Sequence, residues 1–422
     1  MEPDLNVTVH GIRFKNPLVV APATPTGGAR YLRRCFESGA GAVVVKSVSD
    51  ITAHQDYIRP RFTILNRNAY PWSFSNYSSE FAAWQSVDEW MADLKLAKGY
   101  ADEHGAVLIG SIFSASTVDR WVELAKMQED IGCELIELDF GCPNVTASAH
   151  SDVALDGAEL GANPQASAEI THRVVSALKI PVYCKLTSEG CNPVTVARAC
   201  KAAGAHGMVV LNRTPSLDID VETGRPLLGG GYAGVGGPWM LPIMLKWVVK
   251  VIKETGLPVS ATSGIWRPED VTKAIMCGAH TVQTCTAIMY GTRGYGVVEY
   301  FLKGMRSFMR ERNIPNLDAI RGITIPQIRT FPELLRIPKE NIWAEVRGAD
   351  CTGCGLCPHW CYYDAITLDA DKKAAVDPDL CDGCGLCVVL CPADAFDMKT
   401  TGETYYLGPY QPKWKRRTHV DV

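Results

Sequence analysis

The chain has 422 residues, a formal net charge of −4 and a pI near 6.2. This length allows a large core with a smaller module beside it, and the mildly acidic balance gives no sign of a nucleic-acid partner. No stretch approaches the roughly 20 apolar residues that span a bilayer, and the opening MEPDLNVTVHG lacks the basic and apolar regions of a secretory signal. We therefore expect a cytoplasmic protein with no membrane partner, whose 16 cysteines stay reduced.

The first expected element is a short hairpin over residues 5–14, LNVTVHGIRF, which turns at a His-Gly pair. Short apolar runs follow, separated by stretches of helical periodicity. These runs lie at residues 18–23, 42–47, 106–111, 135–140, 181–186, 207–212, 258–264 and 281–287. Nearly continuous apolar strands that alternate with helices are typical of a parallel sheet covered by helices.

Eight such strand–helix units predict an α/β fold, a (β/α)8 TIM barrel over residues 1–312. A doubly wound sheet is the alternative, but it needs a Rossmann-type opening turn that the sequence lacks in the right place. Long connections follow three of the strands, at residues 48–83, 142–164 and 213–237. In a barrel they would crowd the face where active sites lie.

Beyond the barrel the strand–helix rhythm is lost. Residues 313–348 carry scattered prolines and are expected to form a linker that packs against the barrel. A ferredoxin module is predicted at residues 349–398, followed by a tail at 399–422 that ends in a small basic cluster, PKWKRRTHV. Such a cluster is usually a solvated end, with docking of a partner as the alternative.

Eight cysteines of the predicted module form two matching runs. Each run is spaced C-x2-C-x2-C-x3-C, as in bacterial-type ferredoxins that hold two [4Fe–4S] clusters, where the fourth cysteine of each run ligates the other cluster. Structural zinc and disulfides are the alternatives, and the duplicated spacing disfavours both. The predicted ligands are Cys351, Cys354, Cys357 and Cys391 for one cluster, and Cys381, Cys384, Cys387 and Cys361 for the other.

Two lysines, Lys46 and Lys185, end predicted strands two and five. Either alone could simply reach solvent, but a cation beside the N1–C2=O edge of a flavin stabilises the reduced ring. Small residues end strands seven and eight, at 262–265 and 284–287, where backbone N–H groups can approach a phosphate. The glycine-rich segment 229–237 matches G-x-G-x-x-G, but no strand is expected directly before it. We interpret it as a flexible loop over the flavin and not as an NAD site.

Strand four ends at Asp139 and leads to Cys142 and Pro143. A cysteine at the barrel mouth can give or take a proton at a carbon next to the flavin. Burial as a small apolar residue is the alternative for a single cysteine.

A barrel joined to paired cysteine runs resembles the catalytic subunits of bacterial NAD-dependent dihydropyrimidine dehydrogenases, and more broadly the class 1 dihydroorotate dehydrogenases. The likeness covers residues 5–398, and the segment 139–143 is similar to the family's N-x-S-C-P motif, whose cysteine is the catalytic acid/base. The resemblance implies FMN, two [4Fe–4S] clusters, an oligomer, and a separate partner with FAD that oxidises NAD(P)H, or a ferredoxin-type donor. Residues expected to hold FMN are Ala23, Thr24, Lys46, Ser47, Asp139, Lys185, Asn212, Gly234, Ser263, Gly264, Cys285 and Thr286. Residues expected to contact the substrate are Asn76, Asn144, Asn212 and Arg213, with Cys142 as the catalytic residue.

Two positions depart from the family pattern. Asp139 stands where the family has Asn, and Arg213 stands where Ser or Thr is usual. Aspartate only accepts hydrogen bonds, whereas arginine only donates them. The two side chains could pair with each other, or they could adapt the pocket to another substrate.

The sequence therefore predicts an oxidoreductase that acts on a C–C bond conjugated to a carbonyl. Uracil or thymine reduction is the first expectation. A different cyclic or acyl unsaturated substrate, selected by Asp139 and Arg213, is the second. An electron-transfer subunit of a larger redox complex is the third, and it would have a blocked barrel mouth.

Overall fold

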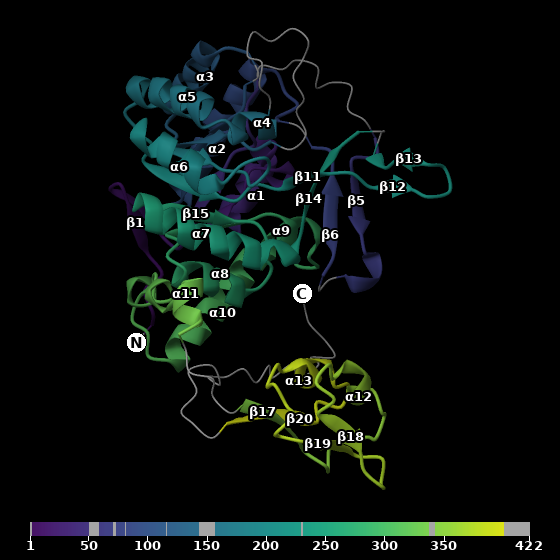
Figure 1. Cartoon of the computed structure of the whole chain (residues 1–422). Helices are drawn as coiled ribbons and strands as arrows, with labels where there is room; N and C mark the ends of the chain where they lie inside the picture. Colours follow the sequence, from purple (N-terminus) through teal and green to yellow (C-terminus); the bar gives the residue numbers. More distant parts are fainter. Residues whose placement is uncertain are drawn as a thin grey trace. The chain divides into compact units, whose positions relative to one another are not determined.

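The structure is a computed structural model of the chain. It describes residues 2–49, 59–70, 73–80, 82–114, 116–142, 157–228, 231–336 and 342–400. The chain divides into two compact units after Ile328 (Figure 1). Among the described residues, no helix combines the length and the apolar character needed to cross a membrane.

The first unit is a closed barrel of parallel strands, and the predicted TIM barrel is confirmed. Its strands in chain order are β3 (Leu18–Val20), β4 (Ala42–Val44), β7 (Val107–Ile112), β8 (Leu135–Asp139), β9 (Val182–Lys185), β10 (Gly207–Val210), β15 (Val259–Thr262) and β16 (Thr281–Thr284). Each lies within a predicted apolar run except β7, which ends one residue beyond its run at Ile112. The runs coincide with the strands because strands buried on both faces favour apolar side chains throughout. Strand β16 pairs with β3, with Thr284 beside Val20, so the sheet has no open edge and a doubly wound sheet is excluded.

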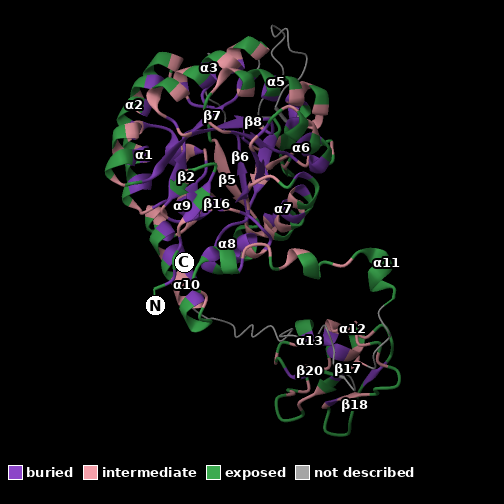
Figure 2. Cartoon of the chain, turned by 90° about the vertical axis from the view of Figure 1, so that its left-hand side faces the viewer, coloured by how far each residue is buried: buried purple, intermediate pink, exposed green. Residues whose placement is uncertain are grey.

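Helices surround the barrel with their apolar faces inward, as the burial colours of Figure 2 show. They are α1 (Ala29–Glu37), α2 (Val87–Glu103), α3 (Val118–Ile131), α5 (Pro164–Ala177), α6 (Pro193–Ala202), α7 (Leu241–Thr255), α8 (Pro268–Met276) and α10 (Val297–Glu311), with the short α4 (Gly157–Ala162) and α9 (Thr286–Tyr290). Helix α2 shows why such segments form. Ser86 and Glu89 make a capping box at its start, and Trp90, Leu94 and Ala97 recur at helical spacing on its buried face.

The predicted N-terminal hairpin is present as β1 (Val7–Val9) and β2 (Ile12–Phe14), which pair in antiparallel fashion. Between them His10 and Gly11 both adopt positive φ angles of 52° and 79°. Such a two-residue turn matches the twist of the strands.

A second sheet forms from two of the long connections. Its strands, in the order β11-β14-β6-β5, are β11 (Thr214–Ser216), β14 (Ala233–Gly236), β6 (Ser75–Ser78) and β5 (Phe62–Leu65), all antiparallel. A small hairpin of β12 (Ile219–Asp220) and β13 (Arg225–Pro226) extends from it. The expectation of a flexible loop at 229–237 is therefore wrong for residues 233–236. They are held on both sides, since Gly234 pairs with Pro215 on one neighbour and Ser78 on the other.

Short 3₁₀ turns complete the first unit, at Thr24–Thr26, Arg67–Ala69, Pro238–Met240, Gly294–Gly296, Leu317–Ala319 and Ile325–Gln327. Leu317 and Ile320 are buried in the barrel core, and the N–H of Gly322 donates to the carbonyl of Ile275. The first part of the expected linker, 313–348, thus packs as part of the barrel unit because its apolar side chains cover the ends of the barrel helices.

The described part of the second unit contains two small antiparallel sheets and three short helices. Its elements are α11 (Phe331–Leu334), β17 (Ile342–Val346), α12 (Cys357–Trp360), β18 (Ile366–Leu368), β19 (Ala374–Val376), α13 (Leu386–Leu390) and β20 (Phe396–Thr400). Strand β17 pairs with β20 along its whole length. The last residues of the expected linker therefore form a strand of the cysteine-rich unit, whose apolar core includes Ala344, Ile366 and Phe396.

Candidate functional site

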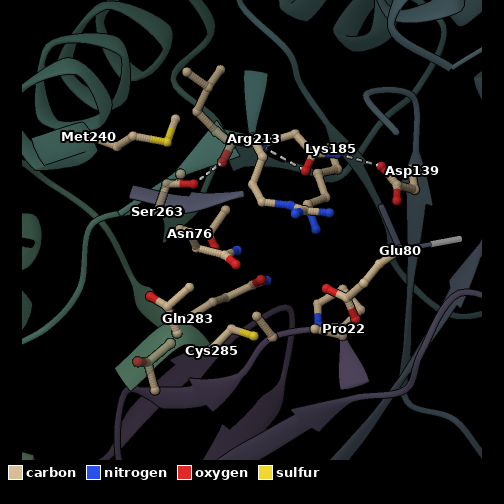
Figure 3. A pocket seen from close by; sticks show the side chains of 18 of the residues that line it. Pro22, Asn76, Glu80, Asp139, Lys185, Arg213, Met240, Ser263, Gln283 and Cys285 are labelled. Atoms are coloured by element: carbon tan, nitrogen blue, oxygen red, sulfur yellow. Dashed lines mark hydrogen bonds between the residues drawn. The ribbon is translucent and has the colours of Figure 1, made fainter. Parts of the chain in front are cut away.

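A cleft opens at the carboxyl ends of the barrel strands. Its empty volume is about 980 Å³, counting the open solvent at its mouth. Residues from the ends of β4, β8, β9, β10, β15 and β16 line it, together with residues of β6 and β14 from the second sheet. Figure 3 shows the side chains of Asn76, Glu80, Lys185, Arg213 and Gln283 around this open space.

Most residues that the sequence singled out line this cleft. These are Ala23, Lys46, Ser47, Asn76, Asp139, Cys142, Lys185, Asn212, Arg213, Ser263, Gly264, Cys285 and Thr286. Thr24 and Gly234 are not among the lining residues. Thr24 instead donates its backbone N–H to Glu80 at 3.2 Å, and Gly234 lies within the second sheet. Asn144 lies outside the described residues.

Lys46 forms a buried ion pair that the sequence did not indicate. Its Nζ lies 3.5 Å from Oε1 of Glu80, and both side chains are less than a tenth exposed. Burial alone would raise the pKa of Glu80, but the charges of Lys46 and Arg213 and the hydrogen bond from Thr24 outweigh it. The pKa of Glu80 is therefore held below its ordinary value, and the cleft contains a fixed carboxylate.

Asp139 and Arg213 do not form the ion pair that the sequence left open. Oδ1 of Asp139 accepts a hydrogen bond from Nδ2 of Asn212 at 2.8 Å and another from the backbone N–H of Gly141 at 3.3 Å. Among the described ion pairs there is none between Asp139 and Arg213. The strand tips of β8 and β10 are thus joined through Asn212, whose short amide reaches Asp139 directly.

Arg213 is held by the second sheet instead. Its Nη1 donates to Oγ of Ser78 and to the carbonyl of Gly234, the latter at 3.5 Å. Its stem lies beside Gly236, where a side-chain carbon would come within 3.3 Å of Cγ of Arg213. Ser78 and Gly234 therefore hold the guanidinium at the edge of the cleft, and a residue larger than glycine at position 236 would crowd the arginine stem.

The two asparagines of the cleft each use their amide oxygen within the protein. Oδ1 of Asn212 accepts from the backbone N–H of Arg213 at 2.9 Å. Oδ1 of Asn76 accepts from the hydroxyl of Tyr290 at 2.5 Å. The amide of Asn212 is oriented by these contacts, because the backbone N–H of Arg213 needs an oxygen and the carboxylate of Asp139 needs an N–H.

A buried polar pair crosses the barrel directly below the cleft. Nε2 of Gln283 on β16 donates to Oε1 of Glu137 on β8, and both residues are only 1% exposed. Within the described part of the chain, Oε2 of Glu137 and Oε1 of Gln283 have no hydrogen-bond partner. Burial raises the pKa of Glu137 to about 7, although Lys185 and Gln283 oppose the shift.

Glycines shape the wall of the cleft beside β15. Gly264 has a φ of +79°, and a side-chain carbon there would lie 2.3 Å from the backbone nitrogen of Leu241. Ser263 has a φ of +86°, and its hydroxyl donates to the carbonyl of Leu211 at 2.7 Å. The segment therefore presents its backbone, and not bulky side chains, to whatever the cleft binds.

In the second unit several of the predicted cluster ligands lie close together. Cys351, Cys354, Cys357 and Cys391 line one small pocket. The first three cysteines of the second run also lie close together, since burial and the thiols of Cys381 and Cys384 raise the pKa of Cys387. Backbone N–H groups of Ala344 and Ala395 donate to the sulfurs of Cys381 and Cys391, each at 3.4 Å.

This cysteine arrangement bears on the alternative of zinc. A single tetrahedral ion needs its sulfurs about 2.3 Å from one point. The cysteines instead surround a space, which suits a cluster held at its corners.

Several functional residues were missed from the sequence. Glu80, Gln283, Gly236, Gly237 and Met240 also line the cleft. Gln283 could have been identified from the sequence, because it is a large polar residue at the end of a strand whose other residues are apolar or small. Nothing in the sequence indicated Glu80, since its partner Lys46 is distant in the chain.

Known proteins share both parts of this arrangement. A family model described as dihydroorotate dehydrogenase matches residues 4–309, and one described as a 4Fe-4S dicluster domain matches residues 344–398. The chain is 28% identical over 370 residues to the NAD-dependent dihydropyrimidine dehydrogenase subunit PreA of Escherichia coli strain K12, with 85% of each chain covered. It is 28% identical over 383 residues to the chloroplastic dihydropyrimidine dehydrogenase (NADP(+)) of Arabidopsis thaliana, covering 84% of this chain and 86% of that one.

Two further relatives each cover about three quarters of the chain. The catalytic subunit of dihydroorotate dehydrogenase B (NAD(+)) from Thermoplasma acidophilum is 28% identical over 322 residues, which is 76% of this chain and 99% of that one. The crystal structure of an Eimeria tenella dihydroorotate dehydrogenase in complex with ferulenol aligns with a TM-score of 0.63 and 18% identity. It covers 76% of this chain and 89% of that one, and at this identity it supports the fold alone.

Proposed function

Because the chain belongs to the dihydroorotate dehydrogenase family, we propose that it reduces, or in reverse forms, a C–C double bond conjugated to a carbonyl. The chain is an oxidoreductase of the class that acts on CH–CH groups, as its relatives are. The observation that carries the proposal is the convergence of Cys142, Lys46 and Lys185 on one cleft at the strand ends. An electron-transfer subunit without its own substrate would have no use for an open cleft lined by such groups.

The residues present fit FMN. Lys46 and Lys185 would face the carbonyl edge of the flavin ring, where cations favour the reduced form. Gln283 would accept a hydrogen bond from a ring N–H, which would satisfy its unpartnered buried oxygen. The backbone around Gly264 and Thr286 would hold the phosphate, because both residues line the cleft and Gly264 packs directly against the backbone of Leu241.

When bound, FMN supplies hydride chemistry and exchanges single electrons with iron–sulfur clusters. The protein's own part is to place the substrate and to handle a proton. In the reducing direction the Cys142 thiol would donate the proton to the carbon next to the one that receives hydride. Asn76 and Asn212 would hold the substrate carbonyls through their amide N–H groups, since their oxygens are already engaged.

The second unit would hold two [4Fe–4S] clusters that relay electrons to the cleft. The cysteine pocket, the donors to the sulfurs, and the match to a dicluster domain support this count. Cross-ligation by the fourth cysteine of each run would tie the clusters together. Iron analysis of anaerobically purified protein should give about eight irons per chain, and four or fewer would contradict the proposed ligand sets.

The electrons would come from a separate partner that carries FAD and oxidises NAD(P)H, or from a ferredoxin-type donor. One relative is named as a subunit of an NAD-dependent enzyme, which supports such a partner. The isolated chain mixed with NADH should then leave its flavin oxidised on the stopped-flow time scale. Rapid bleaching would mean that the chain has a nicotinamide site of its own.

Uracil and thymine are the first substrates to test, because two relatives are named as dihydropyrimidine dehydrogenases. The protein is reduced anaerobically with an artificial donor and then mixed with unsaturated carbonyl compounds. Recovery of the oxidised flavin spectrum, with the saturated product found by mass spectrometry, identifies a substrate. If no compound with a conjugated C–C double bond reoxidises the flavin, the proposed reaction is wrong.

A further inference from the structure

We propose that the two cluster sites of the second unit differ in redox potential, and that Lys373 and Asp382 set the difference. The inference rests on the proposed function, because it concerns the two [4Fe–4S] clusters that this unit would hold. The first site is formed by Cys351, Cys354, Cys357 and Cys391, and the second site by Cys381, Cys384, Cys387 and Cys361. The first site would have the higher potential, so that electrons pass to it from the second.

The two cluster sites are built by an internal repeat. The segment from Cys351 reads C-T-G-C-G-L-C and the segment from Cys381 reads C-D-G-C-G-L-C, so the two differ at a single position. The backbone N–H of Cys351 donates to the carbonyl of Arg347 at 3.2 Å, and that of Cys381 donates to the carbonyl of Asp377 at 3.1 Å. The equivalent residues are 30 positions apart in the sequence, so each residue around one site has a counterpart around the other.

The strands beside the sites repeat in the same way. Strand β18 pairs with β19, and the equivalent strand β20 pairs with β17 (Figure 1). The backbone N–H of Ala344 on β17 donates to the sulfur of Cys381 at 3.4 Å, and that of its counterpart Ala374 on β19 hydrogen-bonds to Cys351. Because the backbone contacts are equivalent, a difference in potential between the two sites has to come from side chains.

A lysine lies beside the first site and has no charged counterpart at the second. Nζ of Lys373 donates to the carbonyl of Cys351, and the residue is partly buried. The counterpart of Lys373 is Trp343, which carries no charge. A cation held next to a cluster stabilises its reduced, more negative state, so Lys373 raises the potential of the first site. Asp369 also lies near Cys351 and opposes Lys373, but it is exposed, so solvent and salt screen its charge.

A carboxylate lies beside the second site and has no charged counterpart at the first. Asp382 is the one residue at which the two segments differ, and its counterpart is Thr352. The hydroxyl of Tyr363 donates to the carboxylate of Asp382, and Tyr363 lies close to Cys384 and Cys361. Asp382 is therefore held near two ligands of the second site, where a negative charge disfavours the reduced cluster and lowers its potential.

Both differences between the sites act in the same direction. The first site has a positive charge that the second lacks, and the second has a negative charge that the first lacks. In each step the second cluster would lose one electron and the first would gain it, with no proton transferred, and two such steps supply the electron pair that the flavin needs. We expect an electron to prefer the first site by at least about tenfold, which corresponds to about 59 mV for a one-electron couple.

The test is a redox titration of the anaerobically purified full chain, followed by electron paramagnetic resonance in the absence of any substrate. Electrons on neighbouring clusters repel each other, so even two equal clusters would show two apparent potentials, and the variants decide the question. Lys373→Gln keeps a donor for the carbonyl of Cys351 but removes the charge, and it should lower the higher potential. Asp382→Thr, which copies Thr352, should raise the lower potential. The double variant should show the smallest separation.

Two controls separate the charge of Lys373 from a structural role. Lys373→Arg keeps the charge and should retain the wild-type potentials. Lys372→Gln removes the same charge from the exposed neighbouring residue and should shift the higher potential much less. An iron content of about eight per chain shows that a variant holds both clusters, and if Lys373→Gln does not, Asp382→Thr decides alone.

Two results would overturn the inference. One is that the potentials stay unchanged in Lys373→Gln and Asp382→Thr although both clusters are present. The other is that Lys372→Gln shifts the higher potential as much as Lys373→Gln does, because the effect would then not depend on the contact with Cys351.

The outcome for the inference can be told apart from that for the proposed reaction, since the potentials are measured without substrate. Shifts in the expected directions, with no reoxidation of the flavin by any unsaturated carbonyl compound, would support unequal clusters and overturn the proposed reaction. Reoxidation of the flavin by such a compound, with potentials that do not respond to either variant, would leave the proposed reaction standing and overturn the inference.

Discussion

Glu137 gives the sharpest test of the electrostatics beneath the cleft. It is fully buried on β8, it accepts one hydrogen bond from Gln283, and its other oxygen has no partner in the described residues. Substitution Glu137→Gln keeps the shape and the acceptor at Oε1 but removes the ionisable group. It also places an N–H donor where the unpartnered oxygen stood.

The size of the effect follows from the pKa of Glu137, which burial raises from an ordinary 4.5 to about 7, with Lys185 and Gln283 opposing the rise and Asp139 adding to it. Below pH 4.5 the carboxyl is protonated in both the folded and the unfolded chain, so its burial carries no penalty from ionisation in the free energy of unfolding. As the pH rises, the unfolded chain releases the proton first, and above about pH 7 the folded chain holds a buried charge. At roughly 1.4 kcal/mol per pH unit, this destabilises the wild type by up to about 3 kcal/mol.

The Glu137→Gln variant has no ionisable group at this position, so its stability does not fall as the pH rises through this range. We expect the variant and the wild type to unfold at similar temperatures near pH 4.5, and the variant to be more stable by several degrees at pH 8. Melting temperatures are measured for both proteins at one fixed scan rate over this range, since unfolding of a cofactor protein is seldom reversible. Glu103→Gln, an exposed position on α2, is the control and should show no such pH dependence.

Infrared spectroscopy provides an independent readout. The wild type should show a buried carboxylic acid band that disappears near pH 7, and Glu137→Gln should lack it. A stability difference that is the same at pH 4.5 and pH 8, with no titrating band in the wild type, would refute the reasoning about burial.

Two further predictions concern the cleft itself. Cys142→Ala should lower turnover by about 10²–10⁴-fold, the usual contribution of a general acid or base, while the flavin spectrum and iron content stay unchanged; in the reverse direction the wild-type rate should rise with pH as the thiol ionises. Full activity in Cys142→Ala would point to another proton donor. Gly264→Ala should be purified with little flavin, because the new carbon would lie 2.3 Å from the backbone nitrogen of Leu241 at a φ of +79°. Gly99→Ala, in open space on α2, should keep its flavin, and equal flavin content in both variants would contradict the proposed cradle.

The barrel could be predicted because its strands are buried on both faces. Runs such as 42–47 and 207–212 are apolar at nearly every position, and the structure places β4 and β10 inside them. Lysines that end such runs stand out, so Lys46 and Lys185 were found. The cysteine runs could be interpreted without a structure, because their spacing in the sequence is by itself typical of cluster ligands.

The other residues of the cleft are brought together by strand pairings and side-chain contacts, which the spacing of residues in the sequence does not indicate. Strand β14 contains two glycines, which weaken a strand signal, and it exists because β6 and β11 hold it on both sides. Asp139 could contact either Arg213 or Asn212, and which of the two it contacts depends on how the side chains point at the ends of β8 and β10. Arg213 contacts the second sheet, so its role could not be predicted before that sheet was known.

The second sheet also links the chemistry of the cleft to the length of its loops. On β6, Asn76 lines the cleft, whereas the next residue, Tyr77, turns to the opposite face and packs with Leu228 and Ala233. Successive residues of a strand face opposite ways, so a shift of one residue exchanges the two faces. A change in the loop before β6 which shifts the register of β6 by one residue would therefore offer the cleft a phenol in place of an amide, whereas a shift of two residues would restore the polar face. The length of that loop thus bears on the chemistry of the cleft as directly as the side chains of the strand do.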